Sequence, residues 1–292
     1  SAFDLEVAGC VIDGFSIVSH GDADAGFYAD VHIWSEFYNY DLLKTNVIQN
    51  CVFTGVVNES SISIVSGDSS NSTIFRNVIF RDITSEYSLI DCYDPSRVIL
   101  EHCTFIGNQT YPNSTVNDYL SEYAHYFVGD VNSSRTISYI NCILADQLVS
   151  YERAFSNHNV NKSILDHSIV YGSDVSGNPG NVLVYTGDPK LTVLGYLRSS
   201  SAVAIGKGKI VTSVRNDIHH ESRPTDGITK PDIGADQFLD ENDDDWADWW
   251  TDRYYPSLTG ALATTANDDA DTLNAEAEYY WGTDPFNDDT DA

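Results

Sequence analysis

Apolar residues recur through the first two thirds of the chain in a fixed relation to a Gly, Asn or His. The repeated segments are Gly9-Cys10-Val11-Ile12, Asn50-Cys51-Val52-Phe53, Asn77-Val78-Ile79-Phe80, His102-Cys103-Thr104-Phe105, Asn141-Cys142-Ile143-Leu144 and His167-Ser168-Ile169-Val170. Their first residues lie about 26 residues apart, apart from two longer intervals of about 40. A period of this length is typical of solenoid proteins.

Each position of the repeat has its own chemistry. Gly, Asn and His are the residues that most readily adopt a positive φ, so the first position predicts a sharp bend. Apolar residues predominate two positions before the bend residue, one after it and three after it. Those before the bend are Val7, Ile48, Phe75, Leu100, Tyr139 and Leu165. Polar residues such as Gln49, Arg76 and Glu101 alternate with them, as in a strand with one buried face.

A short strand, a bend and a second short strand, repeated along the chain, predict an all-β fold of the parallel β-helix type. We expect this solenoid to cover residues 1–239. Cys10, Cys51, Cys103 and Cys142 then share one inward column. They are either free thiols that pack as small apolar side chains or neighbours that form disulfides.

The two longer intervals, near residues 19–45 and 110–135, are predicted to leave the stack as long loops. Both are rich in aromatic and acidic residues. Rings beside carboxylates suit the stacking of sugars or a contact with a partner protein. The same rings equally suit covering an apolar flank of the solenoid. The candidate contact residues are Trp34, Tyr38, Tyr40, Tyr119 and Tyr123.

The region after Gly187 carries a different set of motifs. They are Asp188-Pro189, the run from Tyr196 to Gly208, Arg223-Pro224 and the run from Pro231 to Phe238. In this order they resemble the "DP…YRL..GSPAIDAG…RP….DIGAYE" stretch that closes secreted bacterial right-handed parallel β-helix proteins of the pectate-lyase-like superfold. This chain departs from the pattern at Ser200-Ser201 and at Asp236-Gln237. The resemblance implies a right-handed β-helix and secretion, but no single activity.

Residues 240–292 form a second, strongly acidic unit that resembles the thrombospondin type 3-like calcium repeats of secreted bacterial proteins. Oxygen ligands at loop positions 1, 3 and 5, with a carboxylate at position 12, form a cage for Ca²⁺. The matching residues are Asp240, Asn242, Asp244 and Asp248 in the first loop and Asn267, Asp269, Asp271 and Glu278 in the second.

The two loops differ in how well they match that pattern. The first loop has Thr251 at position 12, and Asp245 and Thr272 replace the usual glycine at position 6 of the two loops. Weak or altered sites are therefore expected, and a solvated, metal-free acidic tail is the alternative. Helices are predicted over residues 246–255 and 273–281, the second ending at Gly282.

The charge balance limits the choice of partners. The chain has 15 Lys+Arg against 44 Asp+Glu, a formal charge of -29. Nucleic-acid binding depends on cationic side chains, so DNA and RNA are poor partners. Membrane insertion is not expected either, because no apolar run approaches about 18 residues. We expect a secreted, extracellular or cell-surface protein, with possible glycosylation at Asn58, Asn71, Asn108, Asn113, Asn132 and Asn161.

No catalytic residue is assigned. The segments typical of polygalacturonases do not fall on the repeats, and 15 Lys+Arg make it difficult to assemble a basic groove for acidic sugars. Arg76 and Glu101 stand one repeat apart, which predicts a cross-strand ion pair. His219-His220-Glu221 suggests a metal, but neighbouring histidines on a strand point to opposite faces, so no site is predicted there.

Three functions remain open. The first is a non-catalytic extracellular structural or adhesive protein stabilised by Ca²⁺. The others are a carbohydrate-active enzyme, such as a polysaccharide lyase or hydrolase, and a glycan-binding module. Val7 is the first apolar column residue, and Ser1 to Glu6 is too short for a capping helix. An open N-terminal coil would allow head-to-tail self-assembly into a filament or sheath.

Overall fold

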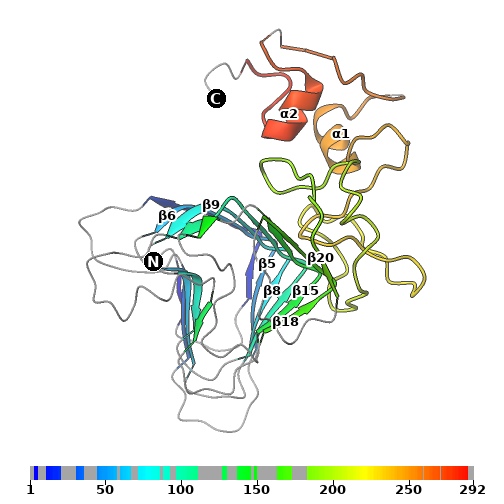
Figure 1. Ribbon diagram of the computed structural model, residues 1–292. Coiled ribbons are helices and arrows are strands. Elements are labelled where there is room, and N and C mark those ends of the chain that lie inside the picture. The colour runs from blue at the N-terminus through cyan, green and yellow to red at the C-terminus, as the bar shows by residue number, and fades with distance from the viewer. Residues whose placement is uncertain are drawn as a thin grey trace.

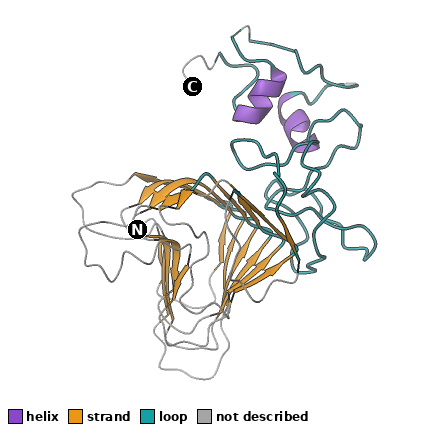
Figure 2. Ribbon diagram, viewed as in Figure 1, coloured by secondary structure: helices purple, strands orange, loops and turns teal. Residues whose placement is uncertain are grey.

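The computed structural model describes residues 3–5, 11–20, 31–35, 45–57, 60–66, 72–85, 88–92, 97–110, 127–129, 137–145, 148–149, 163–172, 183–258, 260–269 and 271–288. Within these ranges the chain is mostly β, with two short helices near its C-terminal end (Figures 1 and 2). No helix in the described ranges has the length and apolar character needed to cross a membrane.

The described strands belong to three sheets, and every pairing between neighbouring strands is parallel. The first sheet contains β1 (Phe3–Leu5), β4 (Val31–Ser35), β7 (Ser60–Ser66), β10 (Ser88–Cys92) and β14 (Phe127–Gly129). The second contains β2 (Val11–Asp13), β5 (Thr45–Gln49), β8 (Ser72–Arg76), β11 (Arg97–Glu101), β15 (Ile137–Ile140) and β18 (Ser163–Asp166). The third contains β3 (Ser16–His20), β6 (Val52–Val57), β9 (Ile79–Ser85), β12 (Thr104–Ile106), β13 (Gln109–Thr110), β16 (Ile143–Ala145), β17 (Leu148–Val149), β19 (Ser168–Tyr171) and β20 (Val184–Tyr185).

The bends between the second and third sheets confirm the predicted column of positive-φ residues. They are Asn50, Asn77, His102, Asn141 and His167, with φ between 50° and 56°. The amide N–H of each of the first four donates to a carbonyl of the next repeat at 2.9–3.1 Å. Each bend therefore turns the chain from the second sheet into the third and also extends the parallel ladder.

The three apolar columns face one common core. Phe75, Leu100 and Tyr139 before the bend are fully buried, and so are the free thiols of Cys51, Cys103 and Cys142 after it. Three positions after the bend, Phe53 stacks on Phe80 with ring centroids 5.1 Å apart, and Phe80 stacks on Phe105 at 4.6 Å. The cysteine column thus holds small apolar side chains, as one of the two alternatives predicts.

The predicted alignment of the first repeat is wrong by five residues. Asp13 pairs with Gln49, so Gly14, with φ 76°, takes the place of the bend residue that we assigned to Gly9. Val52 N donates to Phe15 O, and Ile17 pairs with Phe53. This register assigns Phe15, in place of Cys10, to the position of Cys51. Gly9, Cys10 and Val7 lie outside the described residues.

The two intervals predicted as loops also contribute strands. β4 lies within residues 19–45 and pairs with β7, while β14 lies within residues 110–135 and pairs with β10. The repeat therefore has a third strand that the two-strand interpretation missed. In Figure 1 this sheet stands opposite the sheet formed by β5, β8, β15 and β18.

The closing segment, residues 186–239, has no further parallel strands. It folds irregularly and packs on the outer face of the third sheet, where Leu191, Leu197 and Ile233 join Ile143 and Ile169 in a second apolar cluster. In Figure 2 it forms the teal region between the strands and the helices. The parallel pairing thus ends at β20, short of the predicted boundary at residue 239.

Two helices follow the closing segment, as predicted, with slightly shorter bounds. They are α1 (Asp248–Tyr254) and α2 (Ala275–Trp281). Gly282 ends α2 in the left-handed region with φ 77°. A third apolar cluster contains Trp246, Trp250 and Tyr279, so aromatic side chains hold the two helices together.

Candidate metal loop and surface pocket

The loop before α2 is the best-formed candidate metal centre of the acidic unit. Asp271 N donates to Asp269 Oδ1 at 3.2 Å, and Leu273 N donates to Asp271 Oδ1 at 2.6 Å. Each carboxylate therefore uses one oxygen to fix the loop. The second oxygens, Asp269 Oδ2 and Asp271 Oδ2, are buried and have no hydrogen-bond partner in the described structure.

Helix α2 supplies the third carboxylate. Asn274 caps the helix by accepting a hydrogen bond from Ala277 N at 3.0 Å, which puts Glu278 in the first turn. Only 2% of Glu278 is exposed, and Thr283 Oγ1 donates to its Oε2. One oxygen from each of Asp269, Asp271 and Glu278 lies within 4.8 Å of the others. The carboxylates predicted for positions 3, 5 and 12 therefore meet at one point.

Asn267, at position 1, holds the loop through a bond from its Nδ2 to Asp271 O at 2.9 Å. Asp268 points elsewhere, because its Oδ2 accepts a hydrogen bond from Tyr255 Oη at 2.9 Å. The residue between the expected ligands thus connects the loop to the end of α1. Thr272 occupies position 6, where glycine is usual.

The first acidic loop is arranged differently. Both oxygens of Asp240 accept backbone hydrogen bonds, from Asp244 N and Asp245 N, each at 2.9 Å. Asn242 Nδ2 donates to Asp244 Oδ2 at 3.1 Å, and Asp248 accepts from a backbone amide of the same loop. Within the described ranges, the carboxylates of this loop do not converge as those of the second loop do.

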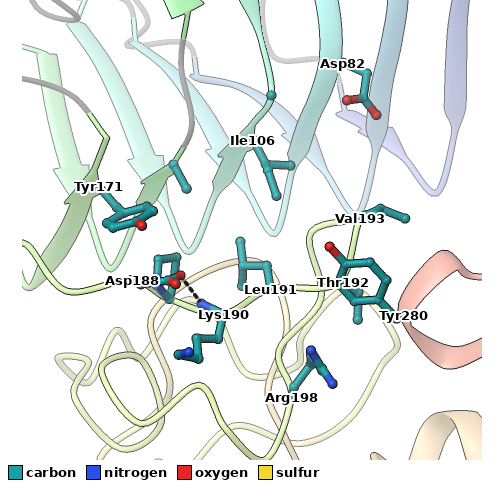
Figure 3. Close-up of a pocket in the computed structure, with 13 residues that line it drawn as sticks. Asp82, Ile106, Tyr171, Asp188, Lys190, Leu191, Thr192, Val193, Arg198 and Tyr280 are labelled. Carbon is teal, nitrogen blue, oxygen red and sulfur yellow. Dashed lines mark hydrogen bonds between the residues drawn. The ribbon is translucent and has the colours of Figure 1, made fainter. Parts of the chain in front are cut away.

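A pocket of about 470 Å³ opens beside α2 (Figure 3). Its wall on the sheet side includes Tyr171 of β19 and Asp82 of β9, and the closing segment supplies Lys190 and Arg198. Tyr280 of α2 completes the wall, and the Arg198 guanidinium lies over its ring at 5.4 Å from the centroid. The pocket combines two aromatic rings with charges of both signs. The sequence interpretation assigned none of these residues to a site, because they come from four separate segments.

None of the described residues that line this pocket is among the aromatic residues that we proposed for a glycan or partner. Trp34 is in β4 and pairs with Val65. Tyr38, Tyr40, Tyr119 and Tyr123 lie outside the described residues.

Of the candidate glycosylation sites, only Asn108 lies in the described ranges. It is fully buried, accepts from Ile83 N at 3.0 Å and donates to Phe80 O at 2.9 Å. The folded chain therefore does not present Asn108 for glycosylation. Asn58, Asn71, Asn113, Asn132 and Asn161 lie outside the described residues.

The predicted ion pair between neighbouring repeats is confirmed, since Arg76 Nε lies 2.7 Å from Glu101 Oε2. The two residues also pair directly between β8 and β11. A cross-strand ion pair between adjacent strands of the second sheet therefore accounts for these two charged residues, without a catalytic role.

Comparisons of the chain with protein-family models, with curated proteins and with solved structures found no match.

Proposed function

We propose that this protein is a calcium-stabilised structural or adhesive protein of the extracellular space, built on a right-handed parallel β-helix. Three parallel sheets with a repeated register support the solenoid architecture. The resemblance of the closing segment to that of secreted bacterial β-helix proteins supports the right-handed winding and the extracellular location.

The convergence of Asp269, Asp271 and Glu278 carries the calcium proposal. Two like charges about 4 Å apart repel by about 4 kcal/mol at an effective dielectric constant of about 20. Three carboxylates at such distances, of which Glu278 is buried and Asp269 and Asp271 are half-buried, need a compensating cation or protons. Oxygen donors alone, on a loop that leads into a helix, are the ligands that Ca²⁺ prefers. The thrombospondin type 3-like spacing of the loop agrees with this choice.

The position of α2 explains why such an ion would stabilise the whole chain. Tyr279 Oη donates to Leu197 O at 2.7 Å, and Val193 N donates to Tyr280 O at 3.1 Å. Both partners belong to the closing segment, which covers the third sheet. A cation bound by Glu278 would hold α2 in the orientation that makes these contacts, so binding and folding are coupled.

Calorimetric titration of the chelator-treated full chain with Ca²⁺ tests the proposal. We expect saturable binding, weakened by at least tenfold in Asp271→Asn and Glu278→Gln. Asp252→Asn is the matched control, because it removes one exposed carboxylate from α1 outside the loop. Wild-type protein that does not bind Ca²⁺, or variants that bind it equally well, would exclude the calcium loop.

Self-assembly remains part of the proposal and has separate support. β2 lies at an end of the second sheet, and β3 pairs with β6 alone among the described strands. Val11 on β2 is 62% exposed and Val18 on β3 is 54% exposed. Exposed apolar residues on an edge strand favour pairing with another chain. Electron microscopy with Ca²⁺ should show filaments that Val18→Lys abolishes, and monomers at high concentration would contradict this part.

A glycan-binding module is the second candidate, and the pocket beside α2 favours it. Tyr171 and Tyr280 offer apolar ring surfaces, while Asp188 and Lys190 offer polar groups for hydroxyls. A glycan array is the test, with Tyr171→Ala expected to abolish any signal. An array without signal, or a signal unchanged in Tyr171→Ala, would exclude glycan binding at this pocket.

A further inference from the structure

A turn in the closing segment gathers ionisable groups below α1. Asp217 Oδ1 accepts hydrogen bonds from His219 N and Glu221 N, both at 2.8 Å. Its Oδ2 accepts from Gln237 N at 2.9 Å. The Asp217 carboxylate therefore fixes the turn over residues 217–221 and joins it to the segment over residues 231–238. His220 has φ 68° in this turn, so the strand alternation that argued against a histidine site does not apply.

The first turn of α1 covers the side chains of this cluster. The His219 ring stacks on the Trp249 ring with centroids 3.9 Å apart and an interplanar angle of 8°. Glu221 Oε1 accepts a hydrogen bond from Trp249 N at 3.1 Å. The two side chains are thus held under one tryptophan and cannot turn freely into solvent.

Three buried polar atoms in the cluster have no hydrogen-bond partner in the described structure: His219 Nε2, Glu221 Oε2 and Asp236 Oδ1. The Asp236 side chain is 1% exposed, and its other oxygen accepts from Leu197 N at 2.7 Å. Its unpaired Oδ1 lies 3.8 Å from His219 Nε2. Carboxylate oxygens of Asp217, Glu221 and Asp236 lie within 4.8 Å of one another. Asp236 therefore lies close to both His219 and Glu221.

The buried charges of this region do not balance. Arg223 is the buried basic side chain here, next to the carboxylates of Asp217, Asp232 and Asp236. Its strongest hydrogen bonds go to backbone carbonyls, to Gly234 O at 2.9 Å and Ala235 O at 2.8 Å. The guanidinium therefore leaves the free oxygens of the cluster without a donor. An unpaired buried polar atom costs about 1–3 kcal/mol, which favours a missing partner.

We propose that His219, Glu221 and Asp236 form a second metal centre, which binds a divalent cation of the Zn²⁺ class. One imidazole nitrogen with two carboxylate oxygens is a donor set suited to Zn²⁺, whereas Ca²⁺ takes oxygen ligands. Ligands about 2.0–2.1 Å from Zn²⁺ are roughly 3.4 Å apart at the tetrahedral angle, close to the 3.8 Å between His219 Nε2 and Asp236 Oδ1. Asp217 positions the turn that carries the ligands.

Titration of the chelator-treated full chain with Zn²⁺, in the presence of saturating Ca²⁺, tests this proposal separately from the calcium loop. We expect one Zn²⁺ per chain and a higher melting temperature. His219→Gln and Glu221→Gln should weaken binding at least tenfold. His220→Gln is the matched control, because the neighbouring histidine is exposed and should leave the affinity unchanged.

Absorption of Co²⁺ bound to the wild-type chain keeps the proposal testable if a variant fails to fold. Four-coordinate binding with a nitrogen ligand should give d–d bands unlike those of the aqueous ion, and Zn²⁺ should displace them. A melting temperature that Zn²⁺ does not change, together with a more stable Glu221→Gln variant, would show that protonation of the carboxylates, and not a metal ion, compensates their charge. This result would overturn the proposal. Equal loss of binding in His220→Gln would overturn it as well.

Discussion

At the scale of single residues, the bend positions combine a backbone requirement with a side-chain requirement. Asn77 has φ 50°, and its Nδ2 donates to Asn50 Oδ1 at 3.1 Å and to Asn216 O at 2.8 Å. Its Oδ1 accepts a hydrogen bond from buried Arg223 at 3.3 Å. Glycine could adopt the positive φ of the bend, but it has no side chain to make these hydrogen bonds. Asn77 therefore connects the bend between the second and third sheets to the closing segment.

Two substitutions of Asn77 should separate these roles. Asn77→Gly loses the side-chain bonds and should lower the free energy of unfolding by about 1–3 kcal/mol, because Arg223 loses a buried acceptor. Asn77→Ala should cost about 1 kcal/mol more, because Ala resists positive φ. Urea denaturation of both variants measures the difference. An Ala variant as stable as the Gly variant would show that the positive φ at this position does not disfavour alanine relative to glycine.

The bend residues are also where the sequence was most informative. Asn50, Asn77 and His102 stand out because few residues tolerate positive φ, and the apolar columns follow from strand periodicity. The first repeat was misaligned because Gly9 and Gly14 both satisfy the same criterion. A one-residue criterion cannot choose between two glycines, whereas the pairing of Asp13 with Gln49 can.

At the scale of elements, α2 is fixed at its C-terminal end by a close contact. A Cβ added to Gly282 would lie 2.1 Å from Leu194 Cδ1 and 2.7 Å from Leu194 Cγ. The closing segment and the helix therefore approach as closely as glycine permits.

Gly282→Ala should destabilise the chain by more than the usual cost of alanine at positive φ, which is about 1–2 kcal/mol. Gly206→Ala is the matched control, since Gly206 has φ 64° and no atom within 4 Å of an added Cβ. Thermal unfolding of both variants should show a larger loss for Gly282→Ala. Equal losses would mean that Leu194 moves aside without cost.

Ion pairs also join the closing segment to the second sheet. Lys209 Nζ lies 2.8 Å from Asp166 Oδ2 at the end of β18, and His167 Nδ1 lies 2.7 Å from Asp166 Oδ1. Burial alone would raise the pKa of Asp166, but the hydrogen bonds from Lys209 and His167 lower it. This group therefore stabilises the fold above its unfolded-state pKa, and the stabilisation is lost as pH falls through the folded-state pKa.

Lys209→Met should reduce the free energy of unfolding by about 1 kcal/mol near pH 7, and by less at an acidic pH below the folded-state pKa of Asp166, where the carboxyl group is protonated in both states. Urea unfolding at the two pH values measures this. The exposed lysine two residues earlier gives the control Lys207→Met, for which no such pH dependence is expected. An equal effect of Lys209→Met at both pH values would exclude the charge contribution.

At this scale only one of the two candidate metal sites could be predicted from the sequence. The candidate ligands of the second acidic loop could be proposed because they lie within twelve residues of one another, so spacing alone describes them. The cluster at His219 brings together a turn, the segment near Asp236 and helix α1. These segments are separated in the sequence, so no local spacing pattern predicts that they are close in space. The strand rule misled there because the two histidines stand in a turn. The sheet containing β4 and β14 was missed because its strands lie far from the bend residues.

At the scale of the whole molecule, charge and architecture are connected through the C-terminal unit. A net charge of -29 favours expansion through self-repulsion, and the acidic loops contribute strongly to it. The same unit contacts the closing segment through Tyr279 and Tyr280. We expect Ca²⁺ at the loop before α2 to keep the unit on the closing segment, and without Ca²⁺ the unit should detach or unfold.

Hydrogen exchange of the full chain with Ca²⁺, compared with chelator and with Mg²⁺ at the same ionic strength, tests this claim most directly. With Ca²⁺ we expect slower exchange over residues 271–288 and over residues 191–198 of the closing segment, while the core strands β8, β11 and β15 remain unchanged. Protection should follow the calorimetric binding curve and should be absent in Asp271→Asn. Exchange over residues 271–288 that is the same in all three conditions would contradict the account.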